Sequence, residues 1–103
     1  MVEEYVEIVH VDKAELEEYK ELNPKMRKIV DNISKLEEKT KIHYEMWRLD
    51  LDPKLEKDHP IRVGGTLWEL CVIRRARTLV DMGYKNVIVD RNISFSDKDY
   101  ISR

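Results

Sequence analysis

One long stretch without helix breakers constrains the fold of this chain most strongly. From Pro24 to about Leu49 there is no glycine and no second proline, and apolar or aromatic side chains recur at steps of three and four residues. This spacing is typical of one face of a helix. A helix of about 26 residues is about 39 Å long at 1.5 Å per residue, which exceeds what a domain of this size needs to cover its core. We therefore expect the helix to pair with a second copy of the chain as well as with a helix of its own chain.

The predicted oligomer interface is the side of this helix that carries the recurring side chains. Its members are Ile29, Ile33, Leu36, Thr40, His43 and Trp47. Thr40 and His43 interrupt the apolar series, and polar residues at such positions more often fix the register or the choice of partner than bind a cofactor. This series of side chains therefore predicts that the protein forms a homo-oligomer.

The first quarter of the chain predicts a strand and then a short helix. Residues Tyr5 to Val11 are rich in β-branched side chains and alternate as a strand does. Asp12 followed by Glu15 forms a capping pattern, which predicts a helix over residues 13–22. Pro24 is then well placed as the first residue of the long helix, about 24–49.

The second half predicts a buried helix and a hairpin. Thr66 and Glu69 form another capping pattern, and Gly83 marks the end of a mostly apolar helix, about 66–83. Residues 86–95 contain two short β-type runs around an Asp/Asn turn, which favours a hairpin. The resulting expectation is one α+β domain over residues 1–103, with the order β-α-α-α-β-β and a small antiparallel sheet.

Composition limits the class of protein. With 103 residues and 42% hydrophobic content, the chain is long enough for one core and short enough that self-association would help its stability. Its single cysteine, Cys71, excludes an internal disulfide and fits a cytoplasmic location. No apolar run could span a bilayer, so we expect no membrane association. Lys and Glu dominate the charged residues while Gln is absent, a bias seen in thermophile proteins.

The formal net charge of −2 conceals an uneven distribution. Residues 1–23 hold eight acidic and two basic side chains, whereas residues 59–91 hold three acidic and six basic ones. The acidic and basic segments are expected to attract each other, within one molecule or between copies, or the basic segment faces an anionic partner. Ordinary mixed surface charge is the alternative interpretation.

The sharpest candidate for a functional site is the Gly64-Gly65-Thr66 sequence. If it forms a loop that opens a helix, its free backbone N–H groups and the helix dipole can hold a phosphate group. The predicted ligand-binding residues are Arg62, Gly64, Gly65, Thr66, Trp68, Arg74 and Arg77. Arg62 would supply a charge-assisted contact, Trp68 a stacking face, and Arg74 or Arg77 a second cation. Two alternatives stay open: the glycines only permit a turn before a capped helix, and the arginines pair with the acidic first helix.

The residues typical of catalysis do not form a recognisable set. Asp50, Asp52, Asp58 and His59 share one polar connection but lack the ligand pattern of a metal site. Cys71 is expected to be buried, and His10, His43 and His59 belong to different predicted elements. We therefore expect no metal, no cofactor and no enzymatic activity.

Two interpretations of function follow. The first is a small oligomeric binding protein that captures a phosphate-bearing ligand, a nucleotide or a short nucleic acid, at the Gly64-Gly65-Thr66 helix start. The second is a protein–protein interaction module, an adaptor or an inhibitor, that acts through the acidic first helix or the apolar stripe. Short, charged single-domain proteins of this kind are common in viruses and mobile elements.

Overall fold

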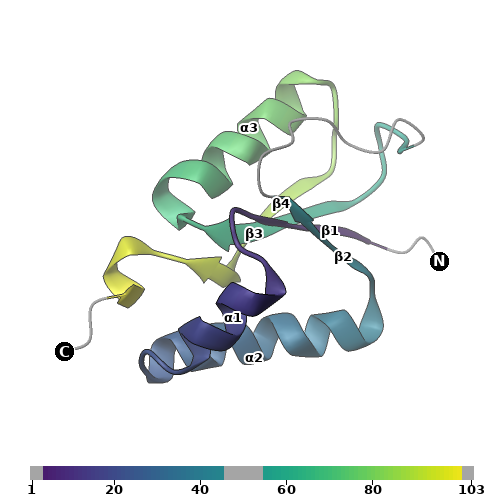
Figure 1. Ribbon diagram of the computed structural model, residues 1–103. Coiled ribbons are helices and arrows are strands. Elements are labelled where there is room, and N and C mark those ends of the chain that lie inside the picture. Colours follow the sequence, from purple (N-terminus) through teal and green to yellow (C-terminus); the bar gives the residue numbers. More distant parts are fainter. Residues whose placement is uncertain (1–3, 46–54, 101–103) are drawn as a thin grey trace.

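The computed structural model describes residues 4–45 and 55–100, which form a sheet with helices on both faces (Figure 1). The elements in chain order are β1 (Tyr5–Val9), α1 (Lys13–Lys20), α2 (Pro24–Lys39), β2 (Ile42–Glu45), β3 (Ile61–Thr66), the π-helical turn η1 (Trp68–Val72), α3 (Ile73–Asp81), β4 (Val87–Phe95) and the 3₁₀ turn η2 (Asp97–Tyr100). The expected mixture of helix and strand is confirmed.

The sheet is parallel throughout, which corrects the antiparallel sheet and the element order predicted from the sequence. Its strand order is β2-β1-β3-β4, and β1 pairs in parallel with both β2 and β3. Residues 86–95 do not form a hairpin: β4 is one strand that pairs in parallel with β3. The Asp/Asn turn predicted within these residues corresponds to a shift in the register of the β3–β4 pairing. Val63 pairs with Val89, whereas Gly65, two residues later, pairs with Ser94. The intervening residues of β4 therefore bulge away from β3.

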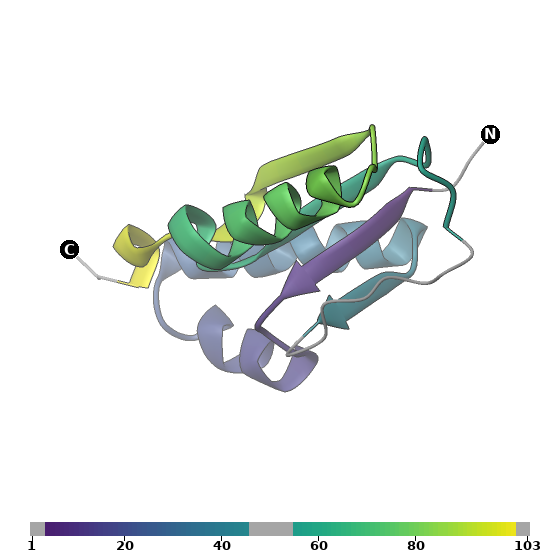
Figure 2. The same cartoon turned by 90° about the horizontal axis from the view of Figure 1, so that it is seen from above.

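The strand order explains why helices cover both faces. The chain moves from β1 to β2 in one direction along the sheet, and from β3 to β4 in the opposite direction. Crossovers of the same hand that run in opposite directions must lie on opposite faces. In agreement, α1 and α2 lie on one face and α3 on the other (Figures 1 and 2). This is the doubly wound arrangement of α/β proteins.

Each face of the sheet has its own apolar core. The core under α1 and α2 contains Val6, Ile8, Val11, Leu16, Met26, Ile29, Val30, Ile33, Ile42, Ile93 and Phe95. The core under α3 contains Val9, Ile61, Val63, Val72, Leu79 and Tyr84. Strand β1 contributes to both cores because alternate side chains of a strand point to opposite faces. A strand buried on both faces is typical of parallel sheets.

The first two helices begin as the sequence predicts. The Asp12 carboxylate accepts a hydrogen bond from the Glu15 N–H at 2.9 Å and so caps α1. The Asn23 side-chain oxygen accepts one from the Met26 N–H at 2.9 Å, and Pro24 follows as the first residue of α2. These starts were predictable because a cap is a local signal, read from a few neighbouring residues.

The predicted long helix ends ten residues early, at Lys39. Thr40 adopts an extended backbone and closes α2, and residues 42–45 form β2. Ile42, which is β-branched, and the aromatic Tyr44 suit a strand, and β1 supplies the hydrogen-bonding edge that an isolated segment lacks. The predicted residues 46–49 of the helix lie outside the described part of the chain.

The apolar stripe of α2 faces the sheet rather than a second copy, which corrects the predicted oligomer interface. Ile33 is 1% exposed, Ile29 is also buried, and Leu36 packs against the same core. Of the polar members, the Thr40 hydroxyl donates to the Glu4 carbonyl at 3.2 Å, and the His43 ring lies in β2. Trp47 lies outside the described residues. Self-association itself stays a prediction.

Candidate functional site

The strand order reverses between β1 and β3, and this defines the candidate site. Val9 pairs with Gly65, so the carboxyl ends of β1 and β3 lie side by side. Beyond them the chain turns to opposite faces, to α1 after β1 and to η1 and α3 after β3 (Figure 1). Ligands of doubly wound sheets bind outside the carboxyl ends of the strands at such a reversal. We call residues 10–12 and 66–71 the switch-point edge.

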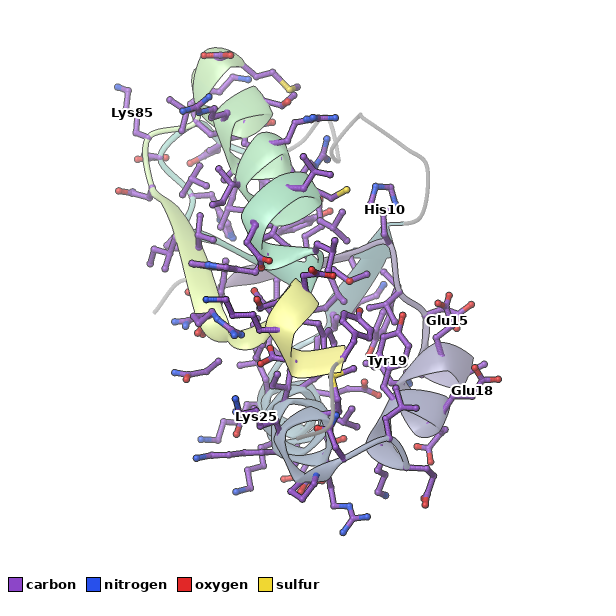
Figure 3. All side chains as sticks on the ribbon, turned by 90° about the vertical axis from the view of Figure 1, so that its left-hand side faces the viewer. His10, Glu15, Glu18, Tyr19, Lys25 and Lys85 are labelled. Carbon is purple, nitrogen blue, oxygen red and sulfur yellow. The ribbon has the colours of Figure 1, made fainter. Side chains whose placement is uncertain are left out.

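On the β1 side, His10 marks the point where the chain leaves the sheet. Its φ of 58° is left-handed, a conformation that side-chain-bearing residues other than Asn, Asp and His adopt rarely. Figure 3 looks onto the carboxyl edge and shows His10 at its rim, between the levels of α3 and α1. Local spacing in the sequence does not indicate this position, because only the strand order brings His10 to the edge where β3 ends.

On the β3 side, the switch-point edge contains the start of a helix that no side chain caps. Leu67 is the N-cap residue of η1, which continues directly into α3, and the peptide bond before Leu67 is cis. The cap predicted for Thr66 and Glu69 is not formed: the Thr66 hydroxyl instead lies 2.5 Å from the Tyr100 hydroxyl. A helix leaves its first N–H groups without helical partners, and its dipole makes that end partly positive. The arrangement is chemically suited to an anion.

Cys71 lies one turn into this helix. It is partly exposed and packs beside the core under α3, whereas the sequence predicted a buried residue. Because β1 and β3 are neighbours, His10 and Cys71 belong to the same edge although 61 positions separate them in the sequence.

The C-terminal segment flanks this edge and holds its carboxylates. Glu69 accepts a hydrogen bond from the Asp97 N–H at 3.0 Å. Hydrogen bonds from the Ser96 hydroxyl and from that N–H lower the pKa of Glu69, so its side chain stays negatively charged. Asp99 accepts hydrogen bonds from the Arg91 guanidinium and the Ser96 N–H, both at 2.9 Å. The C-terminal segment therefore fixes the position of both carboxylates beside the edge.

Trp68 gives the edge an aromatic surface. It opens η1 and is partly exposed. The Arg91 guanidinium carbon lies 5.8 Å from the centre of its ring, within the range of a cation–π contact. Of the predicted ligand-binding residues, Thr66 and Trp68 are thus the two that lie at the switch-point edge.

The predicted glycine loop does not exist. Gly64 and Gly65 lie within β3, and their backbones pair with β1. A Cβ on Gly64 would collide with Ile93, and one on Gly65 with the backbone of Val9. The two glycines therefore allow strands to approach closely, which a sequence cannot distinguish from a tight turn when the neighbouring strands are unknown.

The predicted arginines do not converge on Thr66. Arg62 lies near the other end of β3, where its guanidinium contacts Glu4 at 2.8 Å and Asp90 at 2.6 Å. The hydrogen bond to Glu4 is the main cause of its raised pKa. Arg74 and Arg77 are exposed on α3. Between them in sequence, Arg75 is buried and contacts Glu7 of β1 at 2.5 Å.

Two classes of site can be assessed over residues 4–45 and 55–100. In these ranges no group of three or more His, Cys, Asp or Glu side chains is arranged to hold a metal ion. The same ranges contain no helix that is long and apolar enough to cross a bilayer. Asp50 and Asp52, which the sequence raised as metal ligands, lie outside them.

A second polar cluster joins α1, α2 and β2, the outer strand of the sheet on the side away from β4. The Tyr44 hydroxyl donates to Glu37 at 2.8 Å, and Lys13 contacts the other oxygen of the same carboxylate at 2.5 Å. The cluster lines a groove of about 390 Å³ between the two helices. All three polar groups are satisfied by one another, so this groove is a weaker candidate for a binding site than the uncapped helix start.

Comparison with known proteins assigns the chain to no family. No family model matches it, and searches of curated proteins and of solved structures found no significant match.

Proposed function

We propose that this protein binds a small anionic ligand, bearing a phosphate or a carboxylate, at the switch-point edge. The observation that carries the proposal is the uncapped start of the helix beginning at Trp68, located where the strand order reverses. Backbone N–H groups at such a helix start bind phosphate without a dedicated loop sequence. His10, which follows the end of the neighbouring strand β1, supplies a ring N–H as a further hydrogen-bond donor.

The partly exposed ring of Trp68 favours a ligand with a flat ring. Base–aromatic stacking is worth about 1–3 kcal/mol per base, so a nucleotide would gain both a phosphate contact and a stacking contact. The proposal retains the nucleotide ligand suggested by the sequence. It replaces the Arg62 contact with the helix start and His10, because two carboxylates already hold Arg62.

A substitution at Leu67 tests the proposal directly. Leu67→Asp places a carboxylate at the N-cap position, where it satisfies the free N–H groups and repels an anion while favouring the helix. Leu67→Asn supplies the cap without the charge. Binding of inorganic phosphate and of AMP is measured by thermal shift at low and moderate salt. A ligand at 100 times its Kd should add about 2.7 kcal/mol of stability.

The expected result is a salt-sensitive shift that Leu67→Asp abolishes and Leu67→Asn weakens. Arg77→Ala serves as the matched control, because Arg77 is exposed on α3 away from the helix start and its loss should leave the shift unchanged. A shift of equal size in Leu67→Asp would place the ligand elsewhere. No shift with either ligand would exclude phosphate capture.

A second candidate function is thiol chemistry at Cys71. The observation that favours it is the position of Cys71, one turn into the same helix and on the same edge as His10. The Cys71 sulfur would form a bond to an electrophilic carbon while the leaving group departs with the electron pair of the bond that breaks, and His10, on the same edge, would be the base that takes the thiol proton. We expect iodoacetamide to alkylate Cys71 faster in the folded protein than in urea at the same pH, and more slowly in the His10→Ala variant. Slower alkylation of the folded protein would rule this candidate out.

A further inference from the structure

Arginines that point toward the sheet are paired with carboxylates of the same molecule, whereas two arginines on the outer side of α3 are not. Arg62, Arg75 and Arg91 each contact a carboxylate. Over the residues that the structure describes, Arg74 and Arg77 make no ion pair. These two cations are exposed on α3.

A row of acidic side chains on α1 and the turn after it is a second group without ion pairs in the described part of the chain. Glu15, Glu18 and Glu21 make no ion pair within the same described ranges. Figure 3 shows Glu15 and Glu18 pointing away from α2; Glu18 and Glu21 are exposed, and Glu15 is partly exposed and accepts a hydrogen bond from the Tyr19 hydroxyl. Leu22, at the end of this row, is 52% exposed. We call Glu15, Glu18, Glu21 and Leu22 the acidic face.

The corresponding surface of α3 combines the same two kinds of side chain with the opposite charge. Leu70 is 48% exposed and Val80 57% exposed, and Ile73 between them is also exposed. Leu70, Ile73, Arg77 and Val80 follow one another at steps of three and four residues and so share one side of the helix. We call Leu70, Ile73, Arg74, Arg77 and Val80 the basic face. Each face thus offers charge beside exposed leucine, isoleucine or valine.

The two faces cannot meet within one molecule, because α1 and α3 lie on opposite faces of the sheet (Figures 1 and 2). The intramolecular pairing of the acidic and basic segments that the charge distribution left open occurs at the strands instead, where Arg62 contacts Glu4 and Arg75 contacts Glu7. Complementary surfaces on opposite sides of a molecule bring copies together head to tail.

We propose that the acidic face of one molecule docks on the basic face of a second copy. Ion pairs between exposed side chains contribute only about 0–1 kcal/mol each, so the burial of Leu22 against Leu70, Ile73 or Val80 supplies much of the stabilisation. The contact is heterologous and leaves one free face at each end. Molecules therefore add in a row rather than closing as a twofold dimer.

Two charge-reversed variants test the contact. Arg74→Glu/Arg77→Glu destroys the basic face, and Glu18→Lys/Glu21→Lys destroys the acidic face. Wild-type protein should show a mass that rises with concentration at low salt in sedimentation velocity, and that falls again at high salt. Each variant alone should be monomeric. An equimolar mixture of the two should assemble again, because the intact acidic face of the first variant meets the intact basic face of the second, and the two reversed faces are also opposite in charge.

The matched control is Lys25→Glu/Lys28→Glu, which reverses two exposed charges on α2 and should leave assembly unchanged. Circular dichroism of each variant establishes that it is folded. A monomeric wild-type protein at all concentrations would overturn the proposal. A mixture of the two variants that stays monomeric would also overturn it, and so would a basic-face variant that still assembles. If the protein is monomeric and its basic face binds an acidic peptide, that surface belongs to a different partner.

Discussion

At the scale of single residues, two glycines allow two destabilising effects of a Gly→Ala substitution to be compared. One effect is the strain of a side chain at positive φ, and the other is a steric collision of the new Cβ. Gly65 and Gly83 both have a positive φ, of 117° and 98°. A Cβ on Gly65 would strike the Val9 backbone, whereas one on Gly83 would meet only the Lys57 side chain at 3.8 Å. We expect Gly83→Ala to lower the free energy of unfolding by about 1 kcal/mol and Gly65→Ala by about 3 kcal/mol or more. Equal losses in urea denaturation would contradict the collision.

The buried pair of Glu7 and Arg75 gives a second prediction at this scale. Their side chains are 0% and 6% exposed. Removing one partner leaves the other charge buried, so Arg75→Met should cost about 3–5 kcal/mol. The double variant Glu7→Leu/Arg75→Met leaves no such charge and should be more stable than Arg75→Met alone. Urea denaturation of the wild type, the single variant and the double variant measures these free energies of unfolding. A double variant that is less stable than Arg75→Met would show that the ion pair is not what couples β1 to α3.

At the scale of elements, Glu37 joins three of them, because its carboxylate on α2 contacts Lys13 of α1 and Tyr44 of β2. The hydrogen bond from Lys13, and then that from Tyr44, lower its pKa from the ordinary 4.5. The folded protein thus binds this proton less readily than the unfolded chain. The resulting stabilisation is present above about pH 4.5 and is lost as the pH falls through the lowered pKa.

We therefore expect Glu37→Gln to reduce stability at pH 7 by no more than about 1 kcal/mol, because both charged partners are solvent-exposed. Its melting temperature should also fall less between pH 5 and pH 3 than that of the wild type. The control is Glu38→Gln, which changes an exposed neighbouring carboxylate outside the cluster. Parallel pH profiles for wild type and Glu37→Gln would contradict the assigned role.

The elements also show which signals a sequence carries. The starts of α1 and α2 were predictable because Asp12 and Asn23-Pro24 act on residues three positions away. Strands β2 and β3 were missed because each depends on pairing with β1, far away in sequence. For the same reason local spacing singled out Thr66 and Trp68, which lie at the switch-point edge, but not His10 and Cys71, which only the strand order brings to that edge.

At the scale of the whole molecule, the doubly wound arrangement predicts where the structure opens last. Strand β1 has a hydrogen-bonded neighbour on each side, and its residues 6–9 are buried. Strand β4 has β3 on one side only, and its residues 90–92 lie where the ladder is interrupted. Backbone groups with few buried contacts exchange through small local openings, whereas those of a central strand require global unfolding.

Hydrogen exchange followed by NMR should therefore separate the strands. The amides of β1 and β3 that point into the ladder are expected to exchange at the rate set by global unfolding, and to slow together when the protein is stabilised. The amides of residues 90–92 should exchange much faster and respond little to global stability. Within β4 itself, the paired residues 87–89 serve as the control. If residues 90–92 were protected as strongly as β1, a second strand must cover that edge in solution, and pairing between copies through β4 would replace the head-to-tail contact as the explanation for any assembly.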